Sequence, residues 1–141
     1  MKAIGKSKKV ALIQAAQGAR KAAYCPYSHW AVGAALLTKS GEIITGCNIE
    51  NAAFGPTNCA ERTAIFKAVS EGKKDFAAIA IVGGEEGSEP TEICPPCGVC
   101  RQVMLEFCGP EFEIVLATSP KKFETHTLAE LTPLGFSLRE K

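Results

Sequence analysis

The chain has 141 residues, 46% hydrophobic and 22% charged, which predicts one globular domain over residues 1–141 with a core of its own. The formal net charge of +1 argues against affinity built on nucleic-acid phosphates, and no apolar run is long enough to span a membrane. The seven cysteines are odd in number and no secretory leader precedes them, so we expect a cytoplasmic protein whose clustered thiols bind metal.

Hydrophobic periodicity and turn residues predict nine elements in the order αββαβαββα. We expect helices at residues 7–20, 59–71, 97–107 and 128–131, and strands at residues 30–38, 42–47, 76–83, 112–118 and 123–127. The first two strands are joined by a short turn and should form an antiparallel hairpin. The whole order predicts a three-layer α/β/α fold, with helices on both faces of a mixed, mostly five-stranded sheet.

Local signals set the ends of two central elements. Thr57 or Asn58 should cap the helix at 59–71, because both side chains can accept a hydrogen bond from its first turn. Residues 84–91 are polar and acidic, and we expect them to form a surface loop after the strand at 76–83.

Three cysteines lie in two short stretches, Cys59-Ala60-Glu61-Arg62 and Pro96-Cys97-Gly98-Val99-Cys100-Arg101-Gln102. Cys59 and Cys97 both begin predicted helices, where free backbone N–H groups and the helix dipole stabilise thiolates. Cys97 and Cys100 are one helical turn apart, so one helix start can present both sulfurs to a single ion. Three protein ligands and a fourth position for water are the arrangement of a catalytic zinc site. We therefore expect one Zn²⁺ per chain.

Charged residues flank these cysteines. Glu61 lies in the first turn of its helix, where side chains lean towards the helix N-terminus and hence towards the metal. A carboxylate there can take a proton from water at the metal and deliver it onward; without the cysteines it would be an exposed acid favoured by the helix dipole. Arg62 and Arg101 can donate to the sulfurs and offset their negative charge, or form surface salt bridges instead.

Two residues offer alternatives at the metal site. His29 lies in a polar loop, where a lone histidine is more often solvated than a ligand. Cys94 as a fourth ligand would close the site and make it structural. Cys94 and Cys97 also form a Cys-Pro-Pro-Cys pair that resembles a redox motif, but the two prolines hinder the helical turn that such a pair needs. Cys25 has no assigned role.

Polar and aromatic residues around the predicted hairpin are candidates for substrate binding. Asn48 and Glu50 follow its second strand and precede the metal-binding helix, so an amide and a carboxylate there can bind sugar hydroxyls. In isolation such loop residues are commonly only solvated. Trp30 begins the first strand, where it could stack on a base or serve as a core aromatic.

Six stretches of the sequence match one known family: Tyr24-Cys25-Pro26-Tyr27-Ser28, Val32-Gly33-Ala34-Ala35-Leu36, Gly46-Cys47-Asn48-Ile49-Glu50-Asn51-Ala52, Cys59-Ala60-Glu61-Arg62, residues 96–102 and residues 128–136. Through them the chain resembles the small homotetrameric zinc-dependent cytidine deaminases over almost its whole length. Two positions depart from that family. Trp30 stands where Phe is usual, and Pro95 stands where Ser or Thr is usual.

The resemblance implies a cytidine deaminase-like fold and a hydrolase that converts cytidine and deoxycytidine to uridine and deoxyuridine plus ammonia, in pyrimidine salvage, with zinc-activated water adding to C4. It implies that Asn48 and Glu50 hold the ribose 3′-hydroxyl, and that Ala60 contacts the pyrimidine through its backbone. It also implies a homotetramer in which Phe54 and Phe136 reach the active site of a neighbouring subunit.

Three alternatives stay open. A deaminase of a related nucleoside such as blasticidin S would share the cysteine pattern. A non-catalytic structural zinc module would use four cysteines and would have no need of Glu61. A polynucleotide deaminase would share the site but need a basic groove, against which the near-neutral charge and the presence of Asn48 and Glu50 argue.

Overall fold

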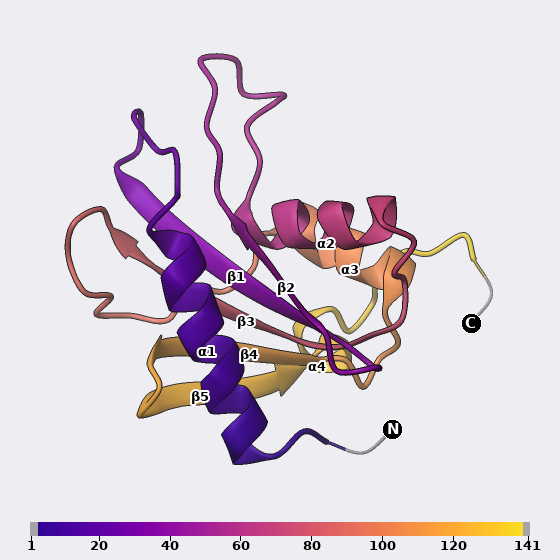
Figure 1. The fold of residues 1–141 in the computed structure, drawn as a ribbon. Helices are drawn as coiled ribbons and strands as arrows, with labels where there is room; N and C mark the ends of the chain where they lie inside the picture. The colour runs from indigo at the N-terminus through magenta and orange to yellow at the C-terminus, as the bar shows by residue number, and fades with distance from the viewer. Residues whose placement is uncertain (1–2, 140–141) are drawn as a thin grey trace.

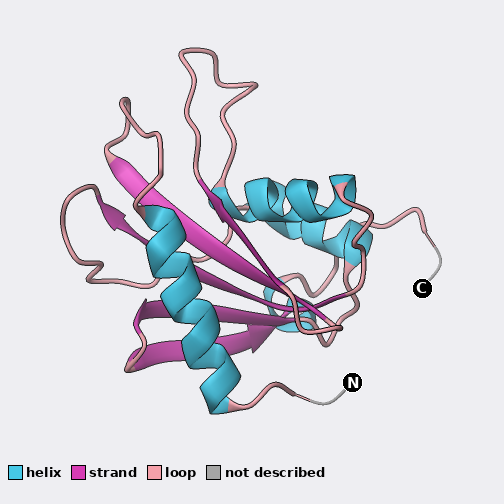
Figure 2. Ribbon diagram, viewed as in Figure 1, coloured by secondary structure: helices cyan, strands magenta, loops and turns pink. Residues whose placement is uncertain are grey.

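The computed structural model describes residues 3–139 of the chain (Figures 1 and 2). In chain order the elements are α1 (Lys6–Arg20), β1 (Trp30–Thr38), β2 (Ile43–Cys47), α2 (Ala60–Ser70), β3 (Phe76–Glu85), α3 (Gly98–Phe107), β4 (Glu113–Ser119), β5 (Lys122–Thr127) and α4 (Leu128–Leu131). Every expected helix and strand is present in the expected order. The described residues include no helix that combines the length and the apolar character needed to cross a bilayer.

The strands form one mixed sheet in the order β2-β1-β3-β4-β5. β1 runs antiparallel to β2 and to β3, β3 runs parallel to β4, and β4 runs antiparallel to β5. The parallel pair is connected through α3, because two parallel neighbours need a crossover that returns the chain to the same end of the sheet.

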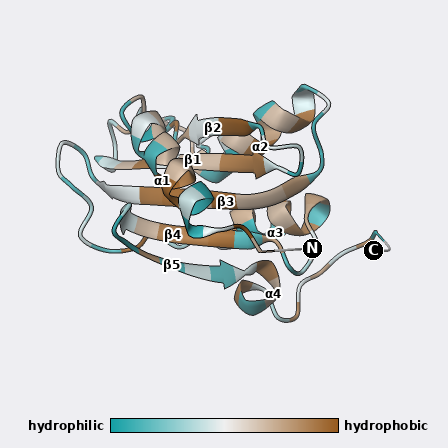
Figure 3. Ribbon diagram, turned by 60° about the horizontal axis from the view of Figure 1, so that its bottom comes forward, coloured by the Kyte–Doolittle hydropathy of each residue, from teal (hydrophilic) through white to brown (hydrophobic). Residues whose placement is uncertain are grey.

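Helices cover both faces of the sheet (Figures 1 and 3). α1 packs on one face through Leu12 and Ile13, and α2 and α3 pack on the other, where Ile65 and Met104 belong to the same core cluster. Alternate residues of β1 enter the two cores, so the strand is buried on both sides, as its continuous apolar sequence predicts. The predicted three-layer α/β/α fold with a five-stranded mixed sheet is confirmed.

Two glycines let helices lie directly on the β1–β2 hairpin. A Cβ at Gly33 of β1 would be 2.0 Å from the carbonyl oxygen of Ala16 in α1, and a Cβ at Gly46 of β2 would be 2.5 Å from the amide nitrogen of Ala64 in α2. Both distances are far below van der Waals contact, so any larger residue would displace a helix. The close contact at Gly46 fixes the first turns of α2 against β2.

Two local predictions are corrected by the structure. The N-cap of α2 is Cys59, which has an extended backbone and makes no side-chain capping bond, so neither Thr57 nor Asn58 caps the helix. Asn58 instead donates from its Nδ2 to the hydroxyl of Thr63, a residue inside α2, over 3.2 Å. β3 continues through the first residues of the predicted loop, because Glu85 pairs with Trp30 across the sheet.

The candidate functional residues gather at one end of the sheet. β1 begins there, and β2 and β3 end there because both run antiparallel to β1. The loop before β1 and the loop after β2 lie side by side at this end (Figure 1), joined by a β-bridge between Tyr24 and Ile49. The second of these loops leads directly into α2, so strand ends, loops and a helix start converge on one place.

Candidate active site and metal centre

The thiols of Cys59, Cys97 and Cys100 lie together. Sγ of Cys97 is 3.8 Å from Sγ of Cys59 and 3.6 Å from Sγ of Cys100, and all three sulfurs are within 4.8 Å of one another. A tetrahedral zinc ion with Zn–S bonds of about 2.3 Å requires sulfurs about 3.8 Å apart. The three sulfurs therefore fit one zinc ion, and residues 3–139 contain no second cluster of potential metal ligands at this spacing.

The cluster forms where α2 and α3 begin. Cys59 is the N-cap of α2 and Cys97 is the N-cap of α3, so each thiol lies at the positive end of a helix dipole, which favours the thiolate. Cys100, in the first turn of α3, is buried, Cys59 is half-buried and Cys97 is exposed. The cluster is thus open on one side, as a catalytic metal site must be to admit water.

Arg62 places a positive charge against the cluster. Its Nη2 donates to Sγ of Cys59 over 3.3 Å, and its buried Nε has no hydrogen-bond partner among the described residues. Hydrogen bonds from the thiol of Cys100 and from Arg62 hold the pKa of Cys59 well below its usual value. Cys59 is therefore prepared to act as a thiolate ligand.

Arg101 makes different contacts from those expected. Its Nε donates to the carbonyl oxygen of Pro96 over 2.9 Å, and its Nη1 donates to that of Leu131 over 2.8 Å. Leu131 ends α4, so its carbonyl lacks an intrahelical donor and competes well for a guanidinium. Within residues 3–139 these contacts direct Arg101 to backbone oxygens and not to sulfur, and they fix the backbone beside Cys97.

Glu61 lies in the first turn of α2 and is only 4% exposed. In the protein alone, burial raises the pKa of its carboxyl to about 7, and the negative charge of Cys59 adds to the rise. A carboxyl with a pKa near the ambient pH can both accept and return a proton, which is the requirement for general acid–base catalysis.

A pocket of about 330 Å³ connects the thiols with the residues expected to bind substrate. Its lining includes Trp30, Asn48, Glu50, Ala60, Glu61, Cys59 and Cys97. The volume lies within the range of small-molecule sites. The structure therefore brings two of the three candidate metal ligands, the candidate proton carrier and most of the candidate substrate residues to one cavity.

Asn48 is largely engaged with the protein itself. Its Oδ1 accepts from the backbone N–H of Val32 over 2.9 Å, and its Nδ2 donates to the carbonyl oxygen of Trp30 over 2.7 Å. One amide N–H is left for a ligand in the pocket. Sequence reasoning missed this use of the amide: the predicted hairpin places the end of β2 beside the start of β1, but no pattern in the sequence shows that the Asn48 side chain joins them.

Glu50 accepts hydrogen bonds from the loop before β1. Oε1 accepts from the N–H of Tyr27 over 3.0 Å and from the N–H of Ser28 over 3.1 Å, and Oε2 accepts from the hydroxyl of Ser28. The Ser28 hydroxyl is the main cause of a pKa for Glu50 that is below its usual value, so the carboxylate is ionised at neutral pH. Ser28 also lines the pocket. It was not among the candidate site residues, and its only signal is its place in the matched stretch 24–28.

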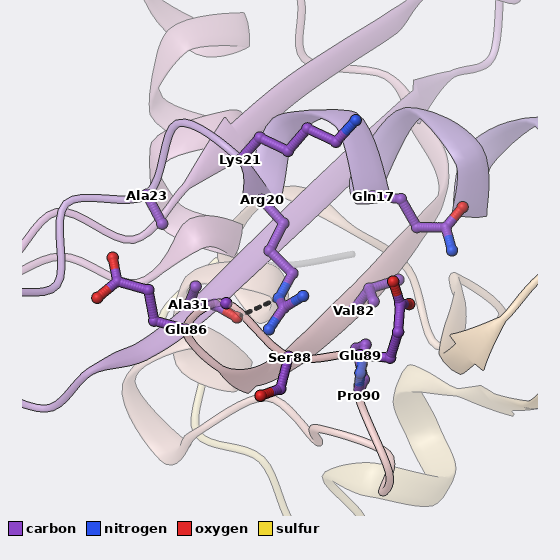
Figure 4. A pocket seen from close by; sticks show the side chains of 11 residues that line it. Gln17, Arg20, Lys21, Ala23, Ala31, Val82, Glu86, Ser88, Glu89 and Pro90 are labelled. Atoms are coloured by element: carbon purple, nitrogen blue, oxygen red, sulfur yellow. Dashed lines mark hydrogen bonds between the residues drawn. The ribbon is translucent and has the colours of Figure 1, made fainter.

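A larger hollow of about 520 Å³ lies elsewhere, between α1 and the loop after β3 (Figure 4). Arg20 projects into this region and donates from Nε to the carbonyl oxygen of Ala31 over 2.8 Å. The lining combines basic Lys21 with acidic Glu86 and Glu89, and it shares no residue with the thiol pocket. The chemistry of the thiols and of Glu61 therefore belongs to the smaller pocket.

The thiol geometry agrees with a comparison to known protein families. Residues 6–116 match the model of the cytidine and deoxycytidylate deaminase zinc-binding region. The chain belongs to the cytidine and deoxycytidylate deaminase family. Zinc is the metal of this family, and Cys59, Cys97 and Cys100 are positioned to bind it.

Individual deaminases are similar over most of their length. A cytidine deaminase of Halalkalibacterium halodurans is 48% identical over 92% of this chain and 94% of its own. The crystal structure of cytidine deaminase from Burkholderia pseudomallei superposes with a TM-score of 0.81 at 47% identity, covering 89% of this chain and 97% of that one. A blasticidin-S deaminase of Bacillus cereus is 38% identical over 75% of this chain and 76% of its own.

Neither alternative fourth ligand joins the thiol cluster of this deaminase. Cys94 lines the pocket, but its sulfur packs against Gly83 of β3, where an added Cβ would be 2.9 Å from it, and it is not among the clustered ligand atoms. His29 points its Nδ1 towards Glu86, at 3.6 Å. The open, three-thiol geometry argues against a closed structural zinc module.

Phe54 and Phe136 of the deaminase chain lie outside its own pocket. Phe54 is 93% exposed and Phe136 is 66% exposed, and neither contributes to the pocket lining. Both aromatic rings are therefore available for contacts beyond the single chain.

Proposed function

We propose that this protein is a cytidine deaminase, which hydrolyses cytidine and deoxycytidine to uridine and deoxyuridine with release of ammonia, in pyrimidine salvage. The observation that carries the proposal is one pocket lined by two of the three clustered thiols, by buried Glu61 and by the polar residues Asn48 and Glu50. The similarity to proteins named cytidine deaminase, in sequence and in structure, supports the same activity.

Glu61 carries out the proton transfers of the reaction. Cys59, Cys97 and Cys100 would hold the zinc ion, which would lower the pKa of a water molecule and so supply a nucleophile at neutral pH. Glu61 accepts the proton of that water as oxygen adds to C4 of the pyrimidine, and it returns this proton to N3. A second proton then passes from the new hydroxyl through Glu61 to the exocyclic nitrogen, the C4–N bond breaks, and ammonia leaves. The burial of Glu61 suits it to both transfers.

The remaining pocket residues bind and orient the nucleoside. Glu50 and the free N–H of Asn48 bind the ribose 3′-hydroxyl, Ala60 offers backbone contacts to the pyrimidine, and Trp30 forms a wall against the base. Support comes from the shared lining of the pocket, in which all four residues take part. The near-neutral charge of the chain favours a free nucleoside over a polynucleotide.

The active protein is a homotetramer in this proposal, and it works in the cytoplasm. Phe54 and Phe136 reach the active sites of neighbouring subunits, for which their exposure in the single chain is the supporting observation. Reduced thiols are needed at Cys59, Cys97 and Cys100, and a reducing compartment maintains them.

Ultraviolet absorbance tests the proposed function directly, because deamination removes the cytidine chromophore. Cytidine and deoxycytidine should both be consumed, and free cytosine should be a far poorer substrate because it cannot make the sugar contacts. Equal kcat/KM on cytosine would refute the sugar contacts, and no consumption of any of the three by zinc-loaded protein would refute the cytidine deaminase function.

Blasticidin S is the substrate of the second candidate function, which the B. cereus relative favours. A parallel assay with blasticidin S decides between the two. We expect a kcat/KM well below that for cytidine, and the reverse order would make blasticidin deamination the main activity.

A further inference from the structure

Ser28 connects the sugar-binding part of the pocket with its base-binding wall. Its hydroxyl donates to Oε2 of Glu50 and accepts from the backbone N–H of Trp30 over 3.0 Å. We propose that Ser28 is a positioning residue for deamination, which orients the Glu50 carboxylate towards the sugar. The inference rests on the proposed function, because it assumes a nucleoside substrate.

The carboxylate of Glu50 is fixed in its plane by donors on both oxygens. Two backbone N–H groups, those of Tyr27 and Ser28, point at Oε1, and the hydroxyl of Ser28 points at Oε2. An ionised carboxylate has about four acceptor sites, so Oε2 keeps one for a sugar hydroxyl. Without the Ser28 hydroxyl, Oε2 loses the protein donor that holds it, and the carboxylate can turn away from the sugar.

The loop that carries Ser28 is built to hold this hydroxyl in place. His29, the next residue, has a φ of 58°, a left-handed conformation that non-glycine residues adopt only when their surroundings hold them there. Its N–H donates to the carbonyl oxygen of Cys25 over 2.9 Å, and its carbonyl oxygen accepts from the N–H of Glu86 over 2.7 Å. The turn from Cys25 to His29 and the bond to Glu86 thus hold the backbone around Ser28, whose hydroxyl contacts Glu50.

Ser28 lies where its hydroxyl can affect substrate binding without contributing much to the stability of the fold. Ser28 is exposed and lines the pocket, and its hydroxyl bonds connect surface loops and not the buried core. Removing the hydroxyl should therefore change stability little, because exposed hydrogen bonds exchange with water. Its main effect should fall on substrates that carry the hydroxyl that Glu50 binds.

Steady-state kinetics of the zinc-loaded protein tests the proposal with three variants. In Ser28→Ala we expect the KM for cytidine to rise roughly tenfold or more, since a hydrogen bond to a charged group is lost, while kcat changes far less. Ser28→Thr keeps the hydroxyl and should restore most of the loss. Ser40→Ala is the matched control, because Ser40 also lies in a surface turn and donates to a glutamate, Glu42, over 3.4 Å, at the opposite end of β1.

The substrate 2′,3′-dideoxycytidine distinguishes a loss of Glu50 orientation from a nonspecific loss of activity. This nucleoside lacks the 2′- and 3′-hydroxyls of the sugar, so Ser28→Ala should affect its kcat/KM much less than that of cytidine. A double-mutant cycle gives the second check: in a Glu50→Ala background, Ser28→Ala should add little to the KM for cytidine. Equal losses on both substrates, additive effects in the cycle, or an unchanged KM for cytidine would each overturn the proposal. Failure of the unmodified protein to deaminate cytidine would instead refute the proposed function itself.

Discussion

Nη2 of Arg62 donates a hydrogen bond of 3.3 Å to Sγ of Cys59, with the guanidinium Nε buried and without a partner among the described residues. Three thiolates and one Zn²⁺ carry a formal charge of −1, which weakens the ability of the metal to acidify water. A partly buried cation in contact with one sulfur withdraws part of that charge. We therefore propose that Arg62 supports the metal chemistry without binding the metal.

Replacement of Arg62 by Gln should lower zinc affinity or kcat by roughly 10–100-fold, because the partner that orients and neutralises Cys59 is lost. Zinc per chain and kcat measure the effect. Arg139→Gln is the control, since Arg139 donates to the carbonyl oxygen of Glu106 on the surface, and it should match the unmodified protein. Identical zinc affinity and kcat in Arg62→Gln would show that the contact with sulfur has no role.

Metal content distinguishes the three proposed ligands from the neighbouring cysteine. Purified protein should contain about one zinc per chain, and Cys97→Ser should lose most of it because one of three ligands is removed. Cys94→Ser should retain it, because Cys94 packs against Gly83 and lies outside the thiol cluster. Loss of zinc from Cys94→Ser at the level of Cys97→Ser would support a four-thiol structural site instead.

Gly46 should be intolerant of any side chain, because α2 lies directly on β2 at this point. Gly46→Ala is expected to lower the free energy of unfolding by about 1–3 kcal/mol or more and to shift the start of α2. Gly18→Ala in α1 is the matched control: an added Cβ there meets no atom within 4 Å, and alanine should stabilise the helix by about 0.5–1 kcal/mol. Denaturant titration measures both, and equal effects would contradict the close packing at Gly46.

Assembly can be tested by mixing inactive subunits. Light scattering should give the mass of a tetramer, and both Phe136→Ala and Glu61→Gln homotetramers should be poorly active. Subunits of the two variants that are unfolded and refolded together should recover activity, because some sites would combine Glu61 of one chain with Phe136 of a neighbour. A fully active monomer, or mixtures with no recovery, would show that each chain completes its own site.

The fold was predictable because its signals are local and consistent. The apolar run at 30–38, the turn after it and the amphipathic stripe of α1 each match the element that forms. The N-cap of α2 was not predictable from propensity: Thr57 and Asn58 are better capping residues, yet Cys59 occupies the cap position, from which its sulfur reaches the thiol cluster. A requirement of the site overrode the local preference there.

The candidate site was predictable in its metal ligands and less so in its supporting contacts. The spacing of Cys97 and Cys100 within one helical turn is a sequence-level constraint, so the cluster could be foreseen. Contacts of Ser28 with Glu50, and of Arg101 with Leu131, join residues 22 and 30 positions apart in the chain. Such contacts depend on how loops are placed after folding, and no periodicity or spacing in a single sequence encodes them.

In the proposed mechanism Glu61 carries the protons of a zinc-dependent deamination, and kcat of Glu61→Gln measures this role. Glutamine keeps the size of the side chain and removes the base, so zinc content and fold should be retained. With zinc at about one per chain, kcat for cytidine should fall by at least roughly 10²–10⁴-fold, since one carboxylate moves protons in several steps. A variant that keeps its zinc and deaminates cytidine at nearly the original kcat would contradict the mechanism.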